Sequence, residues 1–328
     1  MKRNLKRWNV VLIIAILILV LVLVYSGLRI LESTVFTKST GHTQDAPSKT
    51  IHRDGVDYYP KQDITVVLVA GVDTEGPMVS SESYNNSAEA DMVALLIFDE
   101  SSQKMNVIHI NRDTMTDVQV LGVGGKKAGT IYAQLALAHA YGSGLRDSSE
   151  NLRDTVANLM YNVQIDYFIT FNMDAISILN DAVGGVTVNV TDDFSAIDPT
   201  IPTGQVTLTG QQATNFLRSR YGLGDQMNLT RMERHQEYMQ GFLTALRSKT
   251  QADATFLLST CEQVEPYMVT NCTTGSISGL MERYGDYELG DMLTLKGENY
   301  TGNEYMEYHL DEQALDALIL RYLYAPKK

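Results

Sequence analysis

The sequence predicts an α/β protein, an αβα layered sandwich with a mixed central sheet, preceded by one N-terminal transmembrane helix. Beyond residue 60, apolar runs of strand length alternate with segments whose apolar residues recur at helical spacing, a pattern typical of layered α/β folds. The first 30 residues contain an uncharged apolar stretch of the length needed to cross a bilayer. With 328 residues, of which 44% are hydrophobic, the chain is long enough for one large domain or two small ones.

The N-terminal segment has the features of an uncleaved membrane anchor. Four basic residues lie within the first eight positions, and the apolar run VVLIIAILILVLVLV follows at residues 10–24. Basic residues on one side of an apolar span keep that side in the cytoplasm. We therefore predict a basic cytoplasmic tail over residues 1–8, a transmembrane helix over residues 9–28, and a single-pass protein whose remainder lies outside the cell membrane. A cleaved signal peptide is the alternative, but the run is long for one and no small-x-small cleavage site follows it.

The exported part divides into three segments by composition. Residues 29–62 are rich in Thr, Ser, Lys, Asp and Gly and lack a periodic apolar pattern, which predicts an extracytoplasmic linker. A folded domain is predicted over residues 63–252, with a C-terminal extension over residues 253–328 that packs on it. Residues 1–30 carry five positive charges and no negative one, so the total of −13 leaves −18 for the rest. Such an acidic exported chain argues against nucleic acid as a partner.

Three apolar runs predict neighbouring strands of the central sheet. They cover residues 64–70, 92–98 and 105–110. A polar turn at residues 99–104 joins the second and third runs, which makes those two strands antiparallel neighbours. If the first strand also pairs antiparallel with the second, the end of the first, the start of the second and the end of the third meet at one edge of the sheet.

Charged residues stand at each of those three strand ends. Asp73 follows the first strand, Asp91 precedes the second, and Arg112 and Asp113 follow the third. Two carboxylates and an arginine at one point suit a hard divalent cation that carries a phosphate, because the cation takes oxygen ligands and the guanidinium fork binds phosphate. Asp and Arg are also common after strands as turn formers and surface ion pairs. Position alone therefore leaves both interpretations open.

The downstream sequence alternates helices with strands. Helices are predicted where apolar residues recur every three to four positions, and strands where short β-rich runs end at polar residues or glycine. Thr209 and Gln212 form a capping box that marks the start of another helix. The predicted helices cover residues 130–141, 148–160, 173–183 and 311–322, and the predicted strands cover residues 167–171 and 186–190.

Four arginines, Arg218, Arg220, Arg231 and Arg234, fall within a short stretch of this acidic chain. Arg218 and Arg220 would point the same way in an extended segment. A second capping box, starting at Thr230, places Arg231 in the first turn of a helix. The partial positive charge of a helix N-terminus disfavours a cation there, and an anionic ligand would relieve the conflict. Pairing of the arginines with the protein's own carboxylates explains the cluster equally well.

The cysteine and histidine content bears on two further kinds of site. Cys261 and Cys272 are the two cysteines of an exported chain, so we predict a disulfide between them, with two buried free thiols as the alternative. The six histidines show no metal-ligand spacing, so a histidine zinc site is not predicted.

An ordered set of short motifs spans residues 64–250. On these motifs the chain resembles the LytR-CpsA-Psr family of bacterial cell-wall phosphotransferases. The third of them, NRDT, stands where the family usually has Pro-Arg-Asp. In chain order the motifs are GVD (71–73), ADM (90–92), NRDT (111–114), IDYF (165–168), DAVGGV (181–186), L-x-G-x-x-A (208–213), RSR (218–220) and R-x-x-R-x-Q (231–236).

The resemblance implies an enzyme that depends on Mg²⁺ (or Mn²⁺). Such an enzyme moves an anionic glycopolymer, for example teichoic acid or capsule, from an undecaprenyl pyrophosphate carrier in the cytoplasmic membrane to a hydroxyl of peptidoglycan. Metal ligands are implied at Asp73 and Asp91, and an apolar tunnel for the prenyl chain would draw on stretches such as residues 131–140 and 173–179. The implied pyrophosphate-binding residues are Arg112, Arg218, Arg220, Arg231, Arg234 and Gln236.

The catalytic residues that the resemblance implies are Asp91, Arg112 and Asp113. Charge neutralisation on the phosphoryl oxygens by metal and arginines agrees with the chemistry of phosphoryl transfer. Asp113 is a candidate base for the acceptor hydroxyl, and it is equally a candidate ion-pair partner that holds Arg112.

Two other functions would use the same pocket. One is a binding or regulatory protein that senses a polyprenyl phosphate lipid without turnover, and the other is a hydrolase that cleaves the pyrophosphate with water. The presence of Asp73, Asp91 and the arginines argues against a sensor alone. The sequence does not indicate which glycopolymer or which acceptor is used.

Overall fold

The computed structural model describes residues 50–81, 86, 88–219, 227–253, 256–273, 280, 283–284, 287–302 and 305–327. The predicted cytoplasmic tail at residues 1–8 and transmembrane helix at residues 9–28 lie outside the described residues, as does most of the predicted linker. Within the part that the structure describes, no helix combines the length and the apolar character needed to span a bilayer.

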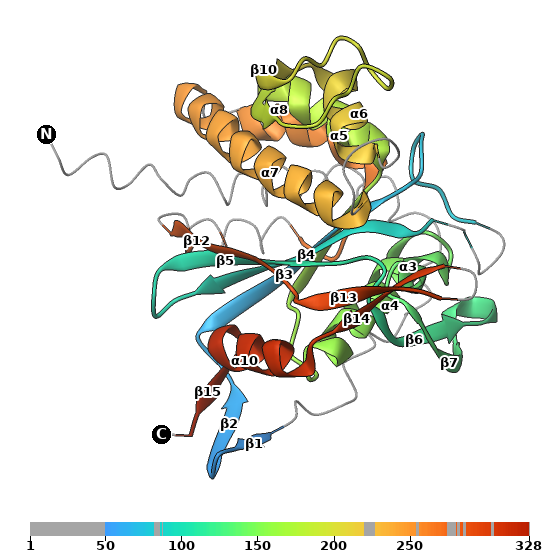
Figure 1. Ribbon diagram of the computed structural model, residues 1–328, viewed down its shortest axis with the longest axis vertical. Coiled ribbons are helices and arrows are strands. Elements are labelled where there is room, and N and C mark those ends of the chain that lie inside the picture. Colours follow the sequence, from blue (N-terminus) through green and yellow to red (C-terminus); the bar gives the residue numbers. More distant parts are fainter. Residues whose placement is uncertain are drawn as a thin grey trace, which may run out of the picture.

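A six-stranded mixed sheet runs through the middle of the molecule (Figure 1). β4 (Ala90–Asp99) and β5 (Lys104–Ile110) pair antiparallel, as predicted, and β3 (Ile64–Val72) pairs antiparallel with β4, which meets the condition set for the three strand ends. β8 adds parallel to β3, β12 adds parallel to β5, and β11 adds antiparallel to β8. In spatial order the strands are β11 (Met268–Thr270), β8 (Tyr167–Phe171), β3 (Ile64–Val72), β4 (Ala90–Asp99), β5 (Lys104–Ile110) and β12 (Glu288–Thr294).

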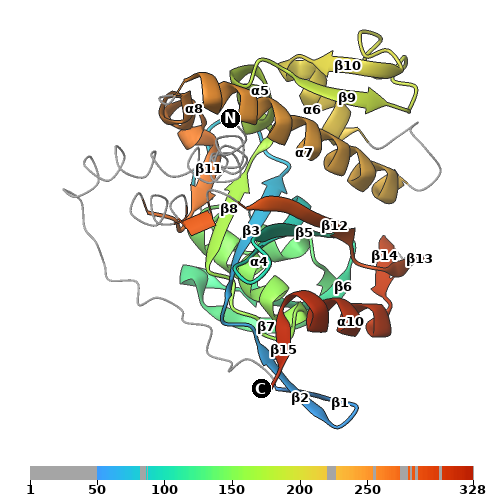
Figure 2. The ribbon, with the colours of Figure 1, turned by 90° about the vertical axis from the view of Figure 1, so that its left-hand side faces the viewer.

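Helices cover both faces of this sheet, which confirms the predicted αβα layering (Figures 1 and 2). Alternate residues of β4 enter two separate cores, with Ala94 and Leu96 in one and Val93 and Leu95 in the other. Because neither face meets water, the strands read as continuous apolar runs. One layer holds α5 (Met173–Ala182), α6 (Gly210–Arg218), α7 (Met227–Ala252) and α8 (Phe256–Val264), and the other holds α3 (Leu137–Ala140), α4 (Arg146–Leu159) and α10 (Glu312–Tyr322).

Side-chain caps place several of these helices. Thr209 and Gln212 form the predicted capping box at the start of α6. Asn172 accepts hydrogen bonds from the backbone N–H groups of Asp174 and Ala175, which starts α5 directly after β8. Asp311 caps α10 in the same way. The predicted helices over 148–160, 173–183 and 311–322 are therefore confirmed, as are the strands at 167–171 and 186–190, the second of which is β9 (Val186–Val190) beside β10 (Gly204–Leu208).

The predicted helix over residues 130–141 is wrong. Its first half is part of β7 (Lys127–Gln134), which pairs antiparallel with β6 (Met115–Leu121), and α3 is all that remains helical. The β-branched and aromatic residues of this half, Thr130, Ile131 and Tyr132, suit a strand once a partner strand is available. The alanines that follow carried the helical signal of the whole segment.

The predicted linker ends earlier than expected. β1 (Ile51–Arg53) and β2 (Val56–Pro60) form a hairpin that pairs with β15 (Tyr324–Pro326) near the C-terminus, and Ile51 joins a buried core. The turn is Asp54-Gly55, whose φ angles of 52° and 77° are what a two-residue hairpin turn requires. Residues 51–60 of the predicted linker therefore belong to the folded domain.

The predicted C-terminal extension over residues 253–328 is an integral part of the sandwich. β11 and β12 form the two edges of the central sheet. The helix α10 supplies Leu315 and Ile319 to one of the two cores. A further hairpin, β13 (Gly297–Thr301) and β14 (Met306–Leu310), follows β12. This arrangement was not predicted, because the parallel pairing of β12 with β5 joins segments that lie almost two hundred residues apart in the sequence.

The predicted disulfide between Cys261 and Cys272 is absent, because Cys272 is a free, buried thiol. Burial raises the pKa of Cys272 to about 12. The thiolate is the reactive form, so we expect Cys272 in the folded protein at neutral pH to resist iodoacetamide and to react once the protein is unfolded in urea. Mass spectrometry of the alkylated peptide measures both states, and rapid labelling of the native protein would contradict the buried position.

Gly241 of α7 allows that helix to approach β9 closely. A Cβ added at Gly241 would lie 2.4 Å from the backbone oxygen of Thr187. We expect Gly241→Ala to lower the free energy of unfolding by about 1–3 kcal/mol, because the backbones must separate. Gly129→Ala is the matched control, since a Cβ at Gly129 meets no atom within 4 Å. Urea denaturation compares the two variants, and equal midpoints would contradict the close approach.

Candidate active site

The structure brings three of the predicted site residues into direct contact at one end of the central strands, where β4 begins and β5 ends. Asp91 lies at the start of β4 and is buried. Its carboxylate forms ion pairs with Arg112, from the loop after β5, and with Arg231, from α7. One Arg231 nitrogen lies 3.1 Å from Asp91 Oδ2, and the other lies 3.1 Å from the Asp91 carbonyl oxygen. The antiparallel pairing predicted for β4 and β5 is what places Asp91 next to Arg112.

Arg231 is held inside the protein and not at a helix end. It is 2% exposed, and it lies in the second turn of α7 because that helix begins at Met227. The predicted capping box at Thr230 is therefore wrong. The unfavourable contact with the helix N-terminus does not arise, and the Asp91 carboxylate balances the charge of Arg231 instead.

The loop that carries Arg112 is shaped by Asn111. The Asn111 side-chain oxygen accepts a hydrogen bond from the Asp113 N–H at 2.9 Å, and the Asn111 carbonyl accepts one from the Thr114 N–H at 3.0 Å. This turn fixes the chain where the resembled family has proline. Arg112 also pairs with Glu89 and with Asp113, whose Oδ1 is 3.3 Å from Arg112 Nε. Asp113 is thus an ion-pair partner of Arg112, and Gln134 Nε2 donates to the same oxygen at 3.0 Å.

Asp73 and Arg218 form a second ion pair beside the first group. Arg218 is the last residue of α6, and its Nη2 lies 3.0 Å from Asp73 Oδ1 while its Nη1 lies 2.9 Å from Glu75. The Asp73 N–H donates to the Glu89 carbonyl at 3.3 Å, which continues the β3–β4 ladder past a bulge. Both side chains are more than a third exposed. Because Asp73 pairs with Glu89, two residues before Asp91, the predicted position of Asp73 at the same end of the strands as Asp91 is confirmed.

We call this group of ion-paired residues the charged cluster. Within the described residues it contains more acidic than basic groups, because five carboxylates contact three guanidinium groups. Magnesium typically binds through one or two protein carboxylates while it keeps waters and phosphate oxygens. The excess of oxygen ligands fits such an ion, although the described residues include no group of three metal-ligand side chains. The members are Asp73, Glu75, Glu89, Asp91, Asp113, Arg112, Arg218 and Arg231.

Three of the predicted pyrophosphate ligands are not placed in the charged cluster. Arg234 pairs with Asp192 at 2.8 Å and lies over the ring of Phe194, and burial lowers the pKa of Arg234. Gln236 donates to the Thr294 hydroxyl at 3.1 Å. Arg220 lies outside the described residues. Arg234, three positions beyond Arg231 on α7, is engaged by Asp192 and by the Ser219 carbonyl and is not a member of the charged cluster.

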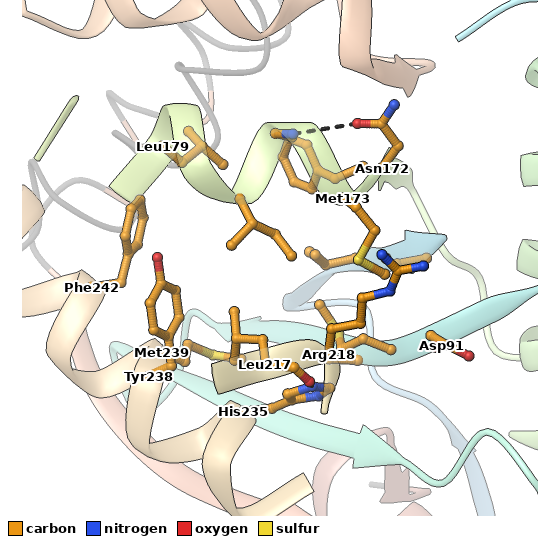
Figure 3. A pocket seen from close by; sticks show the side chains of 18 of the residues that line it. Asp91, Asn172, Met173, Leu179, Leu217, Arg218, His235, Tyr238, Met239 and Phe242 are labelled. Atoms are coloured by element: carbon orange, nitrogen blue, oxygen red, sulfur yellow. Dashed lines mark hydrogen bonds between the residues drawn. The ribbon is translucent and has the colours of Figure 1, made fainter. Parts of the chain in front are cut away.

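An apolar cavity of about 190 Å³ opens beside the charged cluster, between the sheet and helices α5 and α7. Figure 3 shows Asp91 and Arg218 at one end of it, with Leu179, Tyr238 and Phe242 at the other. The walls come from apolar side chains of the sheet, such as Ala94 and Leu96, and of the helices. The cavity thus joins a charged end to a long apolar interior.

One of the two stretches suggested for a lipid tunnel lines this cavity. Met173, Ile176 and Leu179 of α5 contribute to its wall. Residues 131–140 do not, because β7 and α3 belong to the opposite side of the sheet, where Leu135 and Ala138 enter the other core.

A buried histidine in the cavity wall, stacked on a second buried histidine, was not identified from the sequence. His235 of α7 lines the cavity, its ring lies 5.6 Å from that of His109 on β5, and its Nε2 lies 3.1 Å from the Leu217 carbonyl. Burial lowers the pKa of His109 to about 3 and lowers that of His235 well below its usual value, and the positive charge of Arg231 adds to both effects. Both rings are therefore neutral at physiological pH. The four-residue spacing from Arg231 to His235 was the available signal.

Known proteins resemble this chain in sequence and in fold. The model of the LytR_cpsA_psr family matches residues 28–321. The polyisoprenyl-teichoic acid–peptidoglycan teichoic acid transferase TagU of Bacillus subtilis (strain 168) is 26% identical over 256 residues, which cover 78% of this chain and 76% of TagU. TagU of Oceanobacillus iheyensis is 32% identical over 164 residues, which cover 49% of this chain and 45% of that protein.

Solved structures show the same fold at low sequence identity. A protein from Streptococcus agalactiae superposes with a TM-score of 0.65 at 24% identity, covering 79% of this chain and 86% of that one. TagV of B. subtilis gives a TM-score of 0.61 at 18% identity, covering 80% and 98%. TagT bound to LI-WTA gives 0.59 at 20% identity, covering 84% and 95%.

Proposed function

Because the chain belongs to the LytR_cpsA_psr family, we propose that it is a membrane-anchored, Mg²⁺-dependent phosphotransferase. It moves an anionic glycopolymer of the teichoic acid or capsule type from an undecaprenyl pyrophosphate carrier to a peptidoglycan hydroxyl. The names of the TagU relatives describe a polyisoprenyl-linked teichoic acid as donor and peptidoglycan as acceptor, which supports this assignment.

The observation that carries the proposal is the direct junction of the charged cluster with the apolar cavity. Asp91, Arg218 and Arg231 line the same cavity as Leu179, Tyr238 and Phe242. A prenyl pyrophosphate has the same two parts, a charged head and a long apolar chain. Burial of the prenyl chain against apolar walls is favourable because it removes apolar surface from water. The guanidinium groups can form charge-assisted hydrogen bonds with the pyrophosphate oxygens.

The arginines of the charged cluster are suited to neutralise the pyrophosphate. Arg112, Arg218 and Arg231 each use guanidinium nitrogens to bind carboxylates in the protein, and the same nitrogens can bind phosphate oxygens. Asp73 and Asp91 would hold the Mg²⁺, which when bound supplies further positive charge to the non-bridging oxygens. Asp113 holds Arg112 in orientation through its ion pair.

The predicted N-terminal anchor fits this substrate. A transmembrane helix at residues 9–28, with the N-terminus in the cytoplasm, would keep the folded domain at the outer face of the membrane that carries the prenyl lipid. Donor and enzyme would then meet in two dimensions, with the peptidoglycan acceptor on the same side.

The test uses the full-length chain in detergent, with Mg²⁺, a pyrophosphate-linked glycan lipid and peptidoglycan fragments. The expected result is a covalent glycan–peptidoglycan adduct, detected by mass spectrometry, together with release of the prenyl phosphate. Release of prenyl phosphate without any adduct would overturn the transferase in favour of a hydrolase. Binding of the lipid without turnover would overturn it in favour of a sensor.

Ile176→Trp tests whether the cavity holds the prenyl chain. Ile176 lines the cavity from α5, and the larger side chain would occupy space that the lipid needs. We expect affinity for a long-chain prenyl pyrophosphate to fall by about tenfold or more, equivalent to roughly 1.4 kcal/mol. Ser177→Trp, at the next position of α5, is the matched control because Ser177 does not line the cavity. Equal affinities of the two variants in a fluorescent-lipid titration would contradict the lipid tunnel.

A further inference from the structure

Two hairpins next to the charged cluster join into one β surface (Figure 1). Thr114, just before β6, forms a parallel bridge with Tyr308 of β14, and the Tyr308 N–H donates to the Asp113 carbonyl at 2.9 Å. Together with the pairs β6–β7 and β13–β14, this bridge gives the spatial order β13, β14, β6, β7. The surface therefore starts at the loop that carries Arg112.

The alternation of side chains assigns specific residues to the outer face of this surface. Thr114 and Tyr308 are buried, so they mark the inner face. Side chains alternate along each strand, and directly paired residues share a face. Glu307 and His309, which flank Tyr308, therefore lie on the outer face, as do Tyr300 and Glu298 opposite them on β13. By the same count from Thr114, Tyr132 and Gln134 of β7 share that outer face.

Aromatic side chains stand exposed on this face. Tyr132 is 62% exposed and Tyr300 is 51% exposed. Of the ten large apolar side chains that are exposed within the described residues, six lie on these two hairpins or their turns, and the alternation assigns Tyr132 and Tyr300 to the outer face. Exposed aromatic rings on a polar surface provide apolar contact area for a bound partner.

The polar groups around Tyr300 indicate which kind of partner fits. The His309 ring packs edge-on against Tyr300 with 5.0 Å between the ring centroids, and the Tyr300 hydroxyl donates to Glu298 at 3.0 Å. Glu307 lies opposite Tyr300 and binds His309 at 2.7 Å. An aromatic ring between carboxylates can cover the apolar face of a sugar while the carboxylates accept hydrogen bonds from its hydroxyls. The same carboxylates repel a polyanion.

Gln134 connects this face to the charged cluster. Its Nε2 donates to the Met306 carbonyl at 2.7 Å and to Asp113 Oδ1 at 3.0 Å, and Asp113 in turn holds Arg112. The outer face is thus continuous with the residues that would bind pyrophosphate. The apolar cavity lies on the side of the sheet that α5 and α7 cover, so a chain bound there leaves the hairpin side free.

We propose that the outer face of the β13–β14–β6–β7 surface, with Tyr300 and Tyr132 on its two outer strands, binds the acceptor as a neutral, hydroxyl-rich glycan strand. The inference rests on the proposed function, since it assigns the acceptor side of that reaction. The anionic donor polymer is not the occupant, because Glu298 and Glu307 border the aromatic ring.

The test is co-sedimentation of the full-length chain, in detergent, with peptidoglycan sacculi stripped of anionic polymers. The variants are Tyr132→Ala, Tyr300→Ala and their combination, with Tyr59→Ala as the matched control. Tyr59 is also an exposed strand tyrosine, but it lies on β2 in a separate sheet. We expect each single variant at the proposed site to bind sacculi about three- to tenfold more weakly, the effect of losing one aromatic contact. The control and the wild type should bind equally.

Donor binding, measured with a fluorescent prenyl pyrophosphate, separates this inference from the proposed function. It should be the same in all four variants. Unchanged sacculus binding by the double variant would overturn the inference. So would variants that bind sacculi normally and lose only the binding of poly(glycerol phosphate), or that change only in oligomeric state. Weaker sacculus binding in a chain that never transfers glycan would support the docking surface and overturn the transferase.

Discussion

Asp91→Asn is expected to abolish Mg²⁺-dependent turnover and also to lower the free energy of unfolding by about 3 kcal/mol. The carboxylate of Asp91 faces Arg112 and Arg231, and both guanidinium groups are buried. Removing its charge leaves two buried cations with fewer acidic partners, and such a loss is costly in the protein interior. The Asp91 carbonyl and the other partners of Arg112 remain, so the domain should still fold at room temperature.

Asp73→Asn separates the two effects of that substitution. Asp73 is more than a third exposed and contacts the half-exposed Arg218, so its loss should change the free energy of unfolding by less than about 1 kcal/mol. Turnover should nevertheless fall to background, because an open Mg²⁺ site depends on each of its few carboxylates. Rates across a Mg²⁺ titration, with urea denaturation of the same samples, measure both quantities. Wild-type rates for Asp73→Asn at limiting Mg²⁺ would contradict the assignment of Asp73 as a metal ligand.

Arg218→Ala should weaken binding of the pyrophosphate lipid by roughly 1.5–3 kcal/mol, the scale of a charge-assisted hydrogen bond. Apo stability should barely change, because the ion pairs of Arg218 with Asp73 and Glu75 are exposed. Arg231→Ala should weaken binding by a similar amount, but it should also lower stability, since it removes a buried partner of Asp91. Arg218→Lys keeps the charge without the planar fork and should restore part of the affinity.

Arg234→Ala is the matched control for the arginine variants. Arg234, like Arg231, is a buried residue of α7, but it pairs with Asp192, outside the charged cluster. We expect it to lower the melting temperature while the lipid affinity of the folded protein stays unchanged. Thermal shift with and without lipid, at fixed Mg²⁺, measures all four variants. A large affinity loss in Arg234→Ala together with none in Arg218→Ala would reverse the assignment.

The central part of the fold could be predicted because its signals are local. The runs that became β4 and β5 are joined by a short polar turn, so their antiparallel order and the proximity of Asp91 to Arg112 followed from strand direction alone, whereas the position of Asp73 depended on the antiparallel pairing of β3 with β4. The start of α6 was equally local, since Thr209 and Gln212 lie within one helical turn. Each of these features depends on residues that are close in the sequence.

The errors occurred where distant segments decide the structure. β7 became a strand because β6 offered a partner, and β1 and β2 were ordered by β15 from the other end of the chain. The roles of the α7 side chains depended on how that helix packs against the sheet, because Arg231 and His235 line the cavity whereas Arg234 pairs with Asp192. Within the sequence, only the four-residue spacing from Arg231 to His235 pointed to a shared face.

The placement of β11, β12 and β15 bears on how this protein reaches its native state. Strands from residues 64–110 form the middle of the sheet, whereas both edge strands come from residues 268–294. The hairpin of β1 and β2 pairs with residues 324–326, near the C-terminus. Contacts between residues this far apart in the sequence make folding slow, because large loops must close, at a cost in entropy, before the stabilising contacts form. The sheet cannot be completed until nearly the whole chain has been synthesised. Until then its central strands expose unpaired edges, which makes the nascent chain dependent on protection from aggregation.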